Sequence, residues 1–137
     1  MMNSAPKEDD TTLEQVLERS RSADGLTRVN AIPELGRFID DQRAQRRLRE
    51  LLDDDVVTMQ VDAAEVLVRF GGTAGLLTVL EELGRRHNDP DVDYIAYRLY
   101  ELDASGEFPV IDNTVAVRGD LSPAGAIGFE DLKRLKG

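Results

Sequence analysis

Apolar residues recur every three or four positions along most of the chain, which is the spacing of one buried face of an α-helix. The clearest case is the stretch from Asp54 to Gly84, where Gly71 and Gly72 separate two such stripes. Because paired glycines end a helix and permit a tight reversal, we predict two antiparallel helices, the second capped by Thr73. The stripe residues are Val56, Met59, Ala63, Val66, Leu67, Phe70, Leu76, Leu77, Leu80 and Leu83.

Three helices are predicted before this hairpin. The first is capped by Thr11, which with Glu14 in the first turn fits a capping box, and it should end near residues 20–22. The third covers residues 43–52. The acidic turn after it, residues 53–55, should form a strong N-terminal cap for the hairpin, because carboxylates bind the free N–H groups of a first turn and suit the helix dipole.

The second of these helices, over residues 26–39, has a broad apolar face interrupted by Pro33. A proline inside a helix removes a backbone hydrogen bond and crowds the preceding turn. We therefore predict a kink or a break near residues 29–32.

The two ends of the chain differ from its middle. Residues 1–10 are polar and acidic without periodicity, which predicts a disordered tail. A last stripe over residues 92–102 predicts a helix that begins with the cap and proline of residues 88–90. Residues 104–106 predict a loop, and the weak alternation over 108–111 and 114–118 predicts short extended pieces. Residues 119–128 are rich in Gly, Ala and Pro, which predicts a loop, and residues 129–136 predict one short helix.

The helices form a repeat. A small residue recurs 32 and then 33 positions along, at Ala31, Ala63 and Ala96. A larger residue follows each of them four positions later, at Leu35, Leu67 and Tyr100. Such a pair allows two helices to approach closely and fills the groove beside them. We predict one domain over residues 11–137, with repeats at about 24–53, 54–87 and 88–103 and an irregular C-terminal cap over 104–137.

The copies at 55–72 and 88–102 resemble the HEAT-repeat family in its short bacterial form. Leu35-Gly36 keeps the ending usual in that family, whereas Tyr100-Glu101 does not. The resemblance implies an all-α fold, a short right-handed α-α superhelix whose second helices form a concave face that binds protein. The exposed candidates on that face are Arg46, Arg49, Glu81, Glu82 and Arg85.

Charge narrows the class of partner. The chain has 17 basic and 27 acidic residues, for a net charge of −10, and no cysteine. A polyanion would be repelled and a basic protein attracted, so nucleic acid and anionic membranes are disfavoured. We find no signal peptide or apolar span, and predict a cytoplasmic protein. Small, acidic, cysteine-free proteins with HEAT-like repeats resemble immunity proteins, which implies that the chain neutralises a basic toxin.

Groups suited to catalysis or metal binding are few. His87 is the single histidine and is interpreted as a surface residue at a helix end. The acids from Asp89 to Asp93 do not fit a calcium loop, because Tyr94 stands where that loop needs glycine. We interpret these acids as turn residues and predict no catalytic, cofactor or metal site.

Two surface groups leave alternatives open. The basic island over residues 37–49, formed by Arg37, Arg43, Arg46, Arg47 and Arg49, is either a solvated helix face or a nucleic-acid site. Tyr94 and Tyr97, with Tyr100 and Arg98 nearby, are either core residues or a binding hot spot. An enzyme subunit similar to the HEAT-like bilin lyases is a further alternative to a protein-binding module.

Overall fold

The fold is described from a computed structural model, in which residues 12–136 of the 137-residue chain are placed. Every regular element within these residues is helical, which confirms the predicted all-α class. The predicted tail over residues 1–10 lies outside them. The elements are α1 (Leu13–Arg19), α2 (Gly25–Gly36), α3 (Gln42–Leu51), α4 (Val57–Phe70), α5 (Gly72–Arg85), α6 (Val92–Ser105), α7 (Val110–Ala116), the 3-10 helix η2 (Arg118–Asp120) and α8 (Pro123–Lys136).

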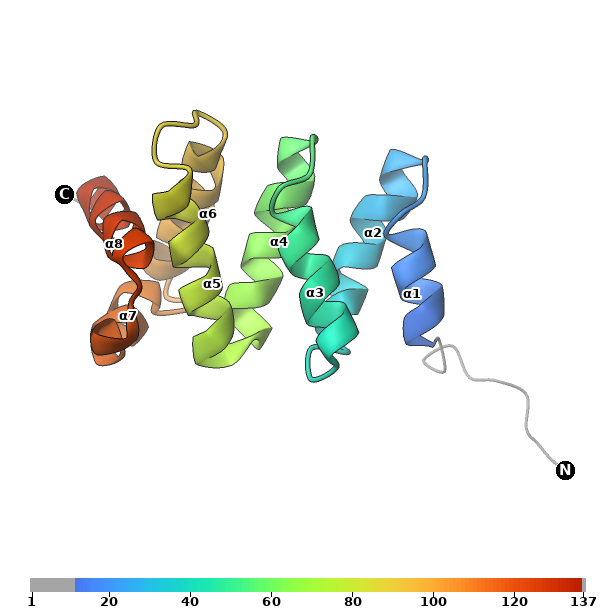
Figure 1. Ribbon diagram of the computed structural model, residues 1–137, viewed down its shortest axis with the longest axis horizontal. Coiled ribbons are helices and arrows are strands. Elements are labelled where there is room, and N and C mark those ends of the chain that lie inside the picture. Colours follow the sequence, from blue (N-terminus) through green and yellow to red (C-terminus); the bar gives the residue numbers. More distant parts are fainter. Residues whose placement is uncertain (1–11, 137) are drawn as a thin grey trace, which may run out of the picture.

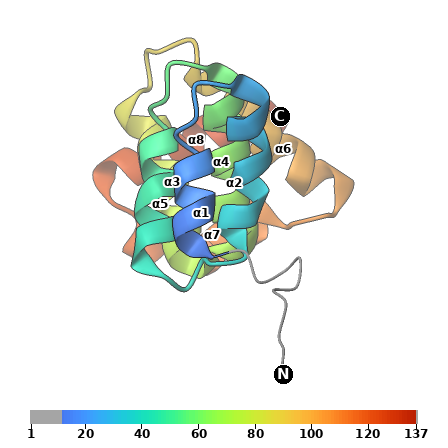
Figure 2. The same ribbon diagram turned by 90° about the vertical axis from the view of Figure 1, so that its right-hand side faces the viewer.

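The helices follow one another along the long axis of the molecule, from α1 at one end to α7 and α8 at the other (Figure 1). Helix α4 packs against α2 on one side and against α6 on the other. Helices α3 and α5 lie beside this row, as the end-on view shows (Figure 2). The small residues of the predicted repeat, Ala31, Ala63 and Ala96, are all buried, on α2, α4 and α6 respectively.

Local hydrogen bonds explain where the first helices begin. Helix α1 has a capping box in which the Gln15 backbone N–H donates to Thr12 Oγ1 at 3.2 Å, and the Thr12 N–H donates to Gln15 Oε1 at 3.0 Å. The predicted box one position earlier includes Thr11, which lies outside the described residues. Asp24 caps α2 by accepting from the Thr27 N–H at 2.9 Å.

The predicted break at Pro33 is absent, since α2 runs without interruption from Gly25 to Gly36. Pro33 itself is exposed, and Val29, whose carbonyl the proline leaves without its usual helical donor, is half-buried. Its neighbours Ala31, Ile32 and Leu35 are fully buried. Burial of this apolar face therefore outweighs the lost hydrogen bond.

The acidic residues before α4 form a turn but not the predicted cap. Val56 occupies the N-cap position of α4, where no side chain bonds the first turn. Asp54 instead accepts a hydrogen bond from the Val56 N–H at 2.9 Å. A similar turn precedes α6, where Asp89 accepts from the Asp91 N–H at 2.9 Å. Because α6 begins only at Val92, the proline predicted in its first turn lies before the helix.

The predicted reversal at the glycine pair is confirmed. Helix α4 ends at Phe70 and α5 begins at Gly72, whose φ of +63° is in the left-handed region that favours glycine. A Cβ on Gly71 would lie 2.5 Å from the Leu67 carbonyl oxygen. The predicted cap at Thr73 is wrong, because the helix already begins at the second glycine and places Thr73 inside it.

The predicted loops and extended pieces over 104–128 are also wrong, because α7 and η2 lie within this region and α8 begins in it. Helix α8 packs closely on α5 and also contacts α6. A Cβ on Gly84 would lie 1.6 Å from the Ala124 carbonyl oxygen, and one on Gly128 would lie 2.1 Å from the Leu80 carbonyl oxygen. Gly128, which belongs to the predicted loop, therefore allows α8 to touch α5, and the C-terminal cap is helical rather than irregular.

Candidate functional site

The five residues predicted on the second helices do not share one open surface. Arg46 and Arg49 are exposed on α3, and Glu81 and Arg85 are exposed on α5. Glu82, in contrast, is 8% exposed, so its predicted exposure is wrong. Arg85 donates to Glu82 Oε1 at 2.6 Å, which further reduces its availability to a partner.

Glu82 is buried because it belongs to an ion-pair network around Arg86. The Arg86 side chain is 11% exposed and donates to Glu82 Oε2 at 3.1 Å, to Gln60 Oε1 at 3.0 Å and to the Leu52 carbonyl at 2.7 Å. It also contacts Asp89 at 3.1 Å. Burial alone would lower the pKa of Arg86, but the hydrogen bonds to Glu82 and Asp89 outweigh it and raise that pKa above its ordinary value. The network joins the turn after α3 to the turn after α5.

Sequence reasoning missed the roles of Gln60 and Arg86, although the repeat contained a signal. Arg28 on α2 pairs with Asp54 in the turn before α4. Gln60 holds the equivalent position 32 residues later and donates to the Asp54 carbonyl at 2.5 Å. Polar residues at this position of two successive repeats therefore stabilise the same turn, the one before α4.

The basic island is divided among separate contacts. Arg43 pairs with Asp41 at 3.0 Å and with Glu14 at 2.7 Å, and hydrogen bonds to these two carboxylates raise its pKa. Arg47 donates to the hydroxyl and carbonyl of Ser20. The remaining members, Arg37, Arg46 and Arg49, have no ion pair with another residue of 12–136. Two of the five arginines, Arg43 and Arg47, thus bond other residues of the chain. This favours the interpretation of the basic island as a solvated helix face.

The two predicted tyrosines lie together at a groove between α4 and α6. Tyr94 is 60% exposed and Tyr97 is 55% exposed, whereas Tyr100 is half-buried and packs on the core. The groove has a volume of about 530 Å³. We call it the tyrosine groove, and its lining residues are Val57, Thr58, Val61, Asp91, Tyr94, Tyr97, Arg98 and Glu101.

Carboxylates dominate the electrostatics of the tyrosine groove. Arg98 pairs with Glu65, lies 3.5 Å from Asp62 and 3.8 Å from Glu101, and is the one basic residue in the lining. Asp91 adds a further carboxylate to the lining. Burial raises the pKa of Asp62, and the nearby guanidinium of Arg98 offsets this only in part. Acidic groups therefore outnumber the single guanidinium around the two exposed phenol rings.

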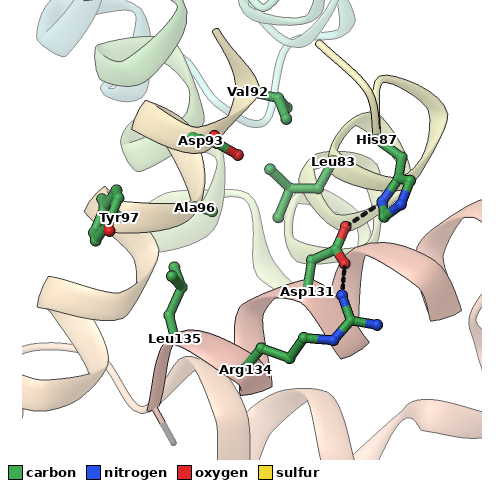
Figure 3. Close-up of a pocket in the computed structure, with 9 residues that line it drawn as sticks. All are labelled: Leu83, His87, Val92, Asp93, Ala96, Tyr97, Asp131, Arg134 and Leu135. Atoms are coloured by element: carbon green, nitrogen blue, oxygen red, sulfur yellow. Dashed lines mark hydrogen bonds and ion pairs between the residues drawn. The ribbon is translucent and has the colours of Figure 1, made fainter. Parts of the chain in front are cut away.

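A second hollow of about 290 Å³ lies where the end of α5 meets α6 and α8. Its apolar lining consists of Leu83, Val92, Ala96 and Leu135, and its polar lining of His87, Asp93, Tyr97, Asp131 and Arg134. We call it the α6–α8 cavity. Figure 3 shows Asp131 between His87 and Arg134. Tyr97 also lines the tyrosine groove, so one residue belongs to both hollows.

His87 is exposed, as predicted, but its partner was not foreseen. Its Nδ1 lies 2.6 Å from Asp131 Oδ2, and Arg134 donates to Asp131 Oδ1, also at 2.6 Å. This pair links the end of α5 to α8. The α6–α8 cavity lining holds no serine, threonine or cysteine that the histidine could activate. Within residues 12–136, no cluster of three or more His, Asp or Glu side chains is suited to a metal ion.

Comparisons of the chain with known protein families, with curated proteins and with solved structures found no match. No helix among residues 12–136 is both long enough and apolar enough to cross a membrane.

Proposed function

We propose that the protein is a non-enzymatic protein-binding module that engages a basic partner through the tyrosine groove. The observation that carries this proposal is the pair of exposed tyrosines, Tyr94 and Tyr97, at an acidic groove about 530 Å³ in volume. Tyrosine and arginine are enriched among the residues that dominate binding energy at protein interfaces. A folded chain also has little reason to leave two neighbouring aromatic rings more than half exposed.

Charge supports a basic partner. The whole chain carries a net charge of −10, which would accelerate the approach of a cationic protein. At short range, lysine and arginine side chains bind the faces of aromatic rings and pair with carboxylates. The tyrosine groove offers both, through Tyr94, Tyr97, Asp91 and Glu101.

The sharper form of the proposal is that the protein neutralises a basic toxin, in the manner of an immunity protein. The same proposal includes the architecture: a short right-handed α-solenoid of the HEAT type, with α2, α4 and α6 as its repeated first helices. The burial of Ala31, Ala63 and Ala96 at equivalent positions supports this architecture. We propose the first helices for the partner surface, instead of the predicted second helices, because Glu82 near the end of α5 is held in an ion pair with Arg86.

The test is capture of a partner by the immobilised protein, followed by identification and purification of that partner. The wild type is compared with a Tyr94→Ala/Tyr97→Ala variant and with Leu26→Ala, a control that removes an exposed apolar side chain from α2. We expect a basic protein that the wild type and the control retain and the double variant releases. Retention by the double variant, or an acidic partner, would contradict the proposal. Growth rescue when the partner is co-expressed with this chain tests the immunity function.

Two alternatives stay predictions with their own measurements. Nucleic-acid binding through the basic island would give a salt-dependent shift with duplex DNA that Arg46→Glu abolishes. Pigment binding by an enzyme subunit of the bilin-lyase type would give a spectral shift when bilin is added.

A further inference from the structure

The α6–α8 cavity combines an apolar floor with carboxylates on two different helices. Asp93 comes from the first turn of α6 and Asp131 from α8. In Figure 3 the two carboxylates approach the hollow from opposite walls, and Leu83 lies between them in this view. At about 290 Å³ the cavity is at the small end of the ~300–1,000 Å³ typical of ligand pockets. Its size suits one long side chain better than a large molecule.

The two carboxylates differ in what they already bind. Asp131 uses both of its oxygens, Oδ2 with His87 and Oδ1 with Arg134. Asp93 is exposed and makes no ion pair or side-chain hydrogen bond with any other residue of 12–136. Both basic side chains of the cavity thus face a carboxylate, while Asp93 offers a negative charge without a counter-ion there.

We propose that the α6–α8 cavity receives a lysine or arginine side chain of the partner protein, with Asp93 as its counter-ion. This inference rests on the proposed function and deepens it, because it assigns one residue class of the partner to one cavity. The aliphatic stem of such a side chain would lie along Leu83, Val92 and Leu135 while its charged head stays near the polar rim. An anion is disfavoured, because Asp93 would repel it and both His87 and Arg134 already contact Asp131.

The position of Tyr97 supports a shared binding surface. Its side chain lines both the tyrosine groove and the α6–α8 cavity. A partner segment that packs on Tyr97 can therefore insert one side chain into the cavity while its neighbours occupy the groove. Ring and carboxylate together suit a cation, since an aromatic face attracts positive charge and Asp93 neutralises it.

The test uses single-residue probes and backbone amide spectra of the isotope-labelled full chain. The probes are Nα-acetyl-lysine methylamide and Nα-acetyl-arginine methylamide, and Nα-acetyl-norleucine methylamide is the uncharged control of matched length. We expect saturable shifts at the amides of Leu83, Asp93, Ala96 and Asp131 with at least one cationic probe. Norleucine should bind roughly tenfold more weakly, as expected for the loss of one charge-assisted contact.

Two variants assign the effect to the carboxylate. Asp93→Asn should weaken binding of the cationic probe roughly tenfold. Asp112→Asn is the matched control, because Asp112 is an exposed acid in the first turn of α7 and lines none of the hollows described above. It should leave binding unchanged. Spectra of both variants away from the substituted site verify that the fold is kept.

The outcomes separate this inference from the proposed function. It is overturned if no probe saturates at concentrations up to about 50 mM, if norleucine binds as well as lysine and arginine, or if Asp93→Asn binds like the wild type. If the Tyr94→Ala/Tyr97→Ala variant loses the partner while Asp93→Asn keeps full affinity for it, the tyrosine groove stands and the cavity assignment falls. If saturable probe binding depends on Asp93 but no basic partner is captured, the cavity chemistry stands and the proposed function falls.

Discussion

The end of α5 and the outer face of α6 both carry polar side chains, but these side chains differ in exposure and in the contacts they make. Glu82 near the end of α5 is buried, and the Arg86 side chain just after it is 11% exposed. The two bond each other, and Arg86 also bonds Gln60 and the Leu52 carbonyl. Tyr94 and Tyr97 on α6 are more than half exposed. Glu82 and Arg86 thus stabilise the fold, whereas Tyr94 and Tyr97 are exposed to a partner. The difference shows that a charged helix face is not by itself a binding surface.

The largest effect is expected from Arg86→Ala. Removing this guanidinium leaves Gln60 Oε1 and the Leu52 carbonyl without its hydrogen bonds, while Glu82 keeps only Arg85. Because each buried acceptor that loses its donor costs about 1–3 kcal/mol, we expect the unfolding free energy to fall by about 3 kcal/mol. Arg85→Ala is the control, because the Arg85 side chain is about half exposed and its ion pairs contribute at most about 1 kcal/mol. Urea denaturation monitored by circular dichroism measures both. Equal losses in the two variants would contradict the contrast between the α5 end and the α6 face.

The next largest effect is expected at Gly84, near the end of α5. Gly84→Ala would place a Cβ against the Ala124 carbonyl of α8, and overpacking of this kind destabilises by about 1–3 kcal/mol. Gly119→Ala is the control, since nothing lies within 4 Å of a Cβ built there. Thermal unfolding should show a clear drop in Tm for Gly84→Ala alone. A Tm equal to that of the control would mean that α5 and α8 do not pack as closely as described.

On the α6 face the expected loss is in affinity and not in stability. Tyr94→Ala should weaken binding of the purified partner by about 2 kcal/mol, as at other hot spots. Its unfolding free energy should change by less than about 0.5 kcal/mol, because the side chain is exposed. Titration calorimetry measures the first quantity and urea denaturation the second. A large loss of stability would place Tyr94 among the residues that hold the fold.

The smallest effect is a difference in pH dependence. Asp89, in the Arg86 network, has a pKa below its ordinary value of 3.8, because the Asp91 N–H and Arg86 hydrogen-bond its charged form. Its contribution to stability is present above pH 3.8 and is lost as the pH falls through the lowered pKa. Asp62, beside the tyrosine groove, has a pKa raised by burial. Its ionisation therefore reduces stability as the pH rises through that raised value.

Asparagine substitutions separate these two contributions. Asp89→Asn should flatten the loss of stability on acidification, whereas Asp62→Asn should improve stability at neutral pH relative to acid pH. Urea denaturation over a series from about pH 3 to pH 7 gives both slopes. The two substitutions should change the slope of unfolding free energy against pH in opposite directions relative to the wild type. A change in the same direction would contradict the environments assigned to Asp89 and Asp62.

The helices over residues 12–103 could be predicted because each carries an apolar stripe with the helical period. The C-terminal region could not, because its glycines are ambiguous along the chain. Gly125 and Gly128 are typical of a loop in sequence, yet both are buried in α8. Likewise, Pro33 predicts a break only if the surrounding apolar face is ignored. Local propensity failed at these places because burial against a distant helix outweighs it.

The candidate site was also predicted only in part, because contacts with distant residues decide which side chains are exposed. Tyr94 and Tyr97 were identified by residue type and lie together because the three-residue spacing brings them onto neighbouring positions of α6. Glu82 was expected to be exposed because its own helix does not reveal what covers it. Arg86, which bonds Glu82, also bonds Gln60, and Gln60 is 22 residues from Glu82 in the sequence. The partner of His87, Asp131, is 44 residues away.

The sequence by itself determined the all-α class, the glycine reversal between α4 and α5, the repeated small residues and the strong negative charge. These features depend on periodicity and backbone freedom, which are properties of short stretches, and on composition, which is a property of the whole sequence. The tertiary structure decided that α8 packs on α5, that Glu82 is buried and that the tyrosines border a groove. Those outcomes depend on which distant residues meet, because desolvation and close packing act between helices and leave no local pattern in the chain.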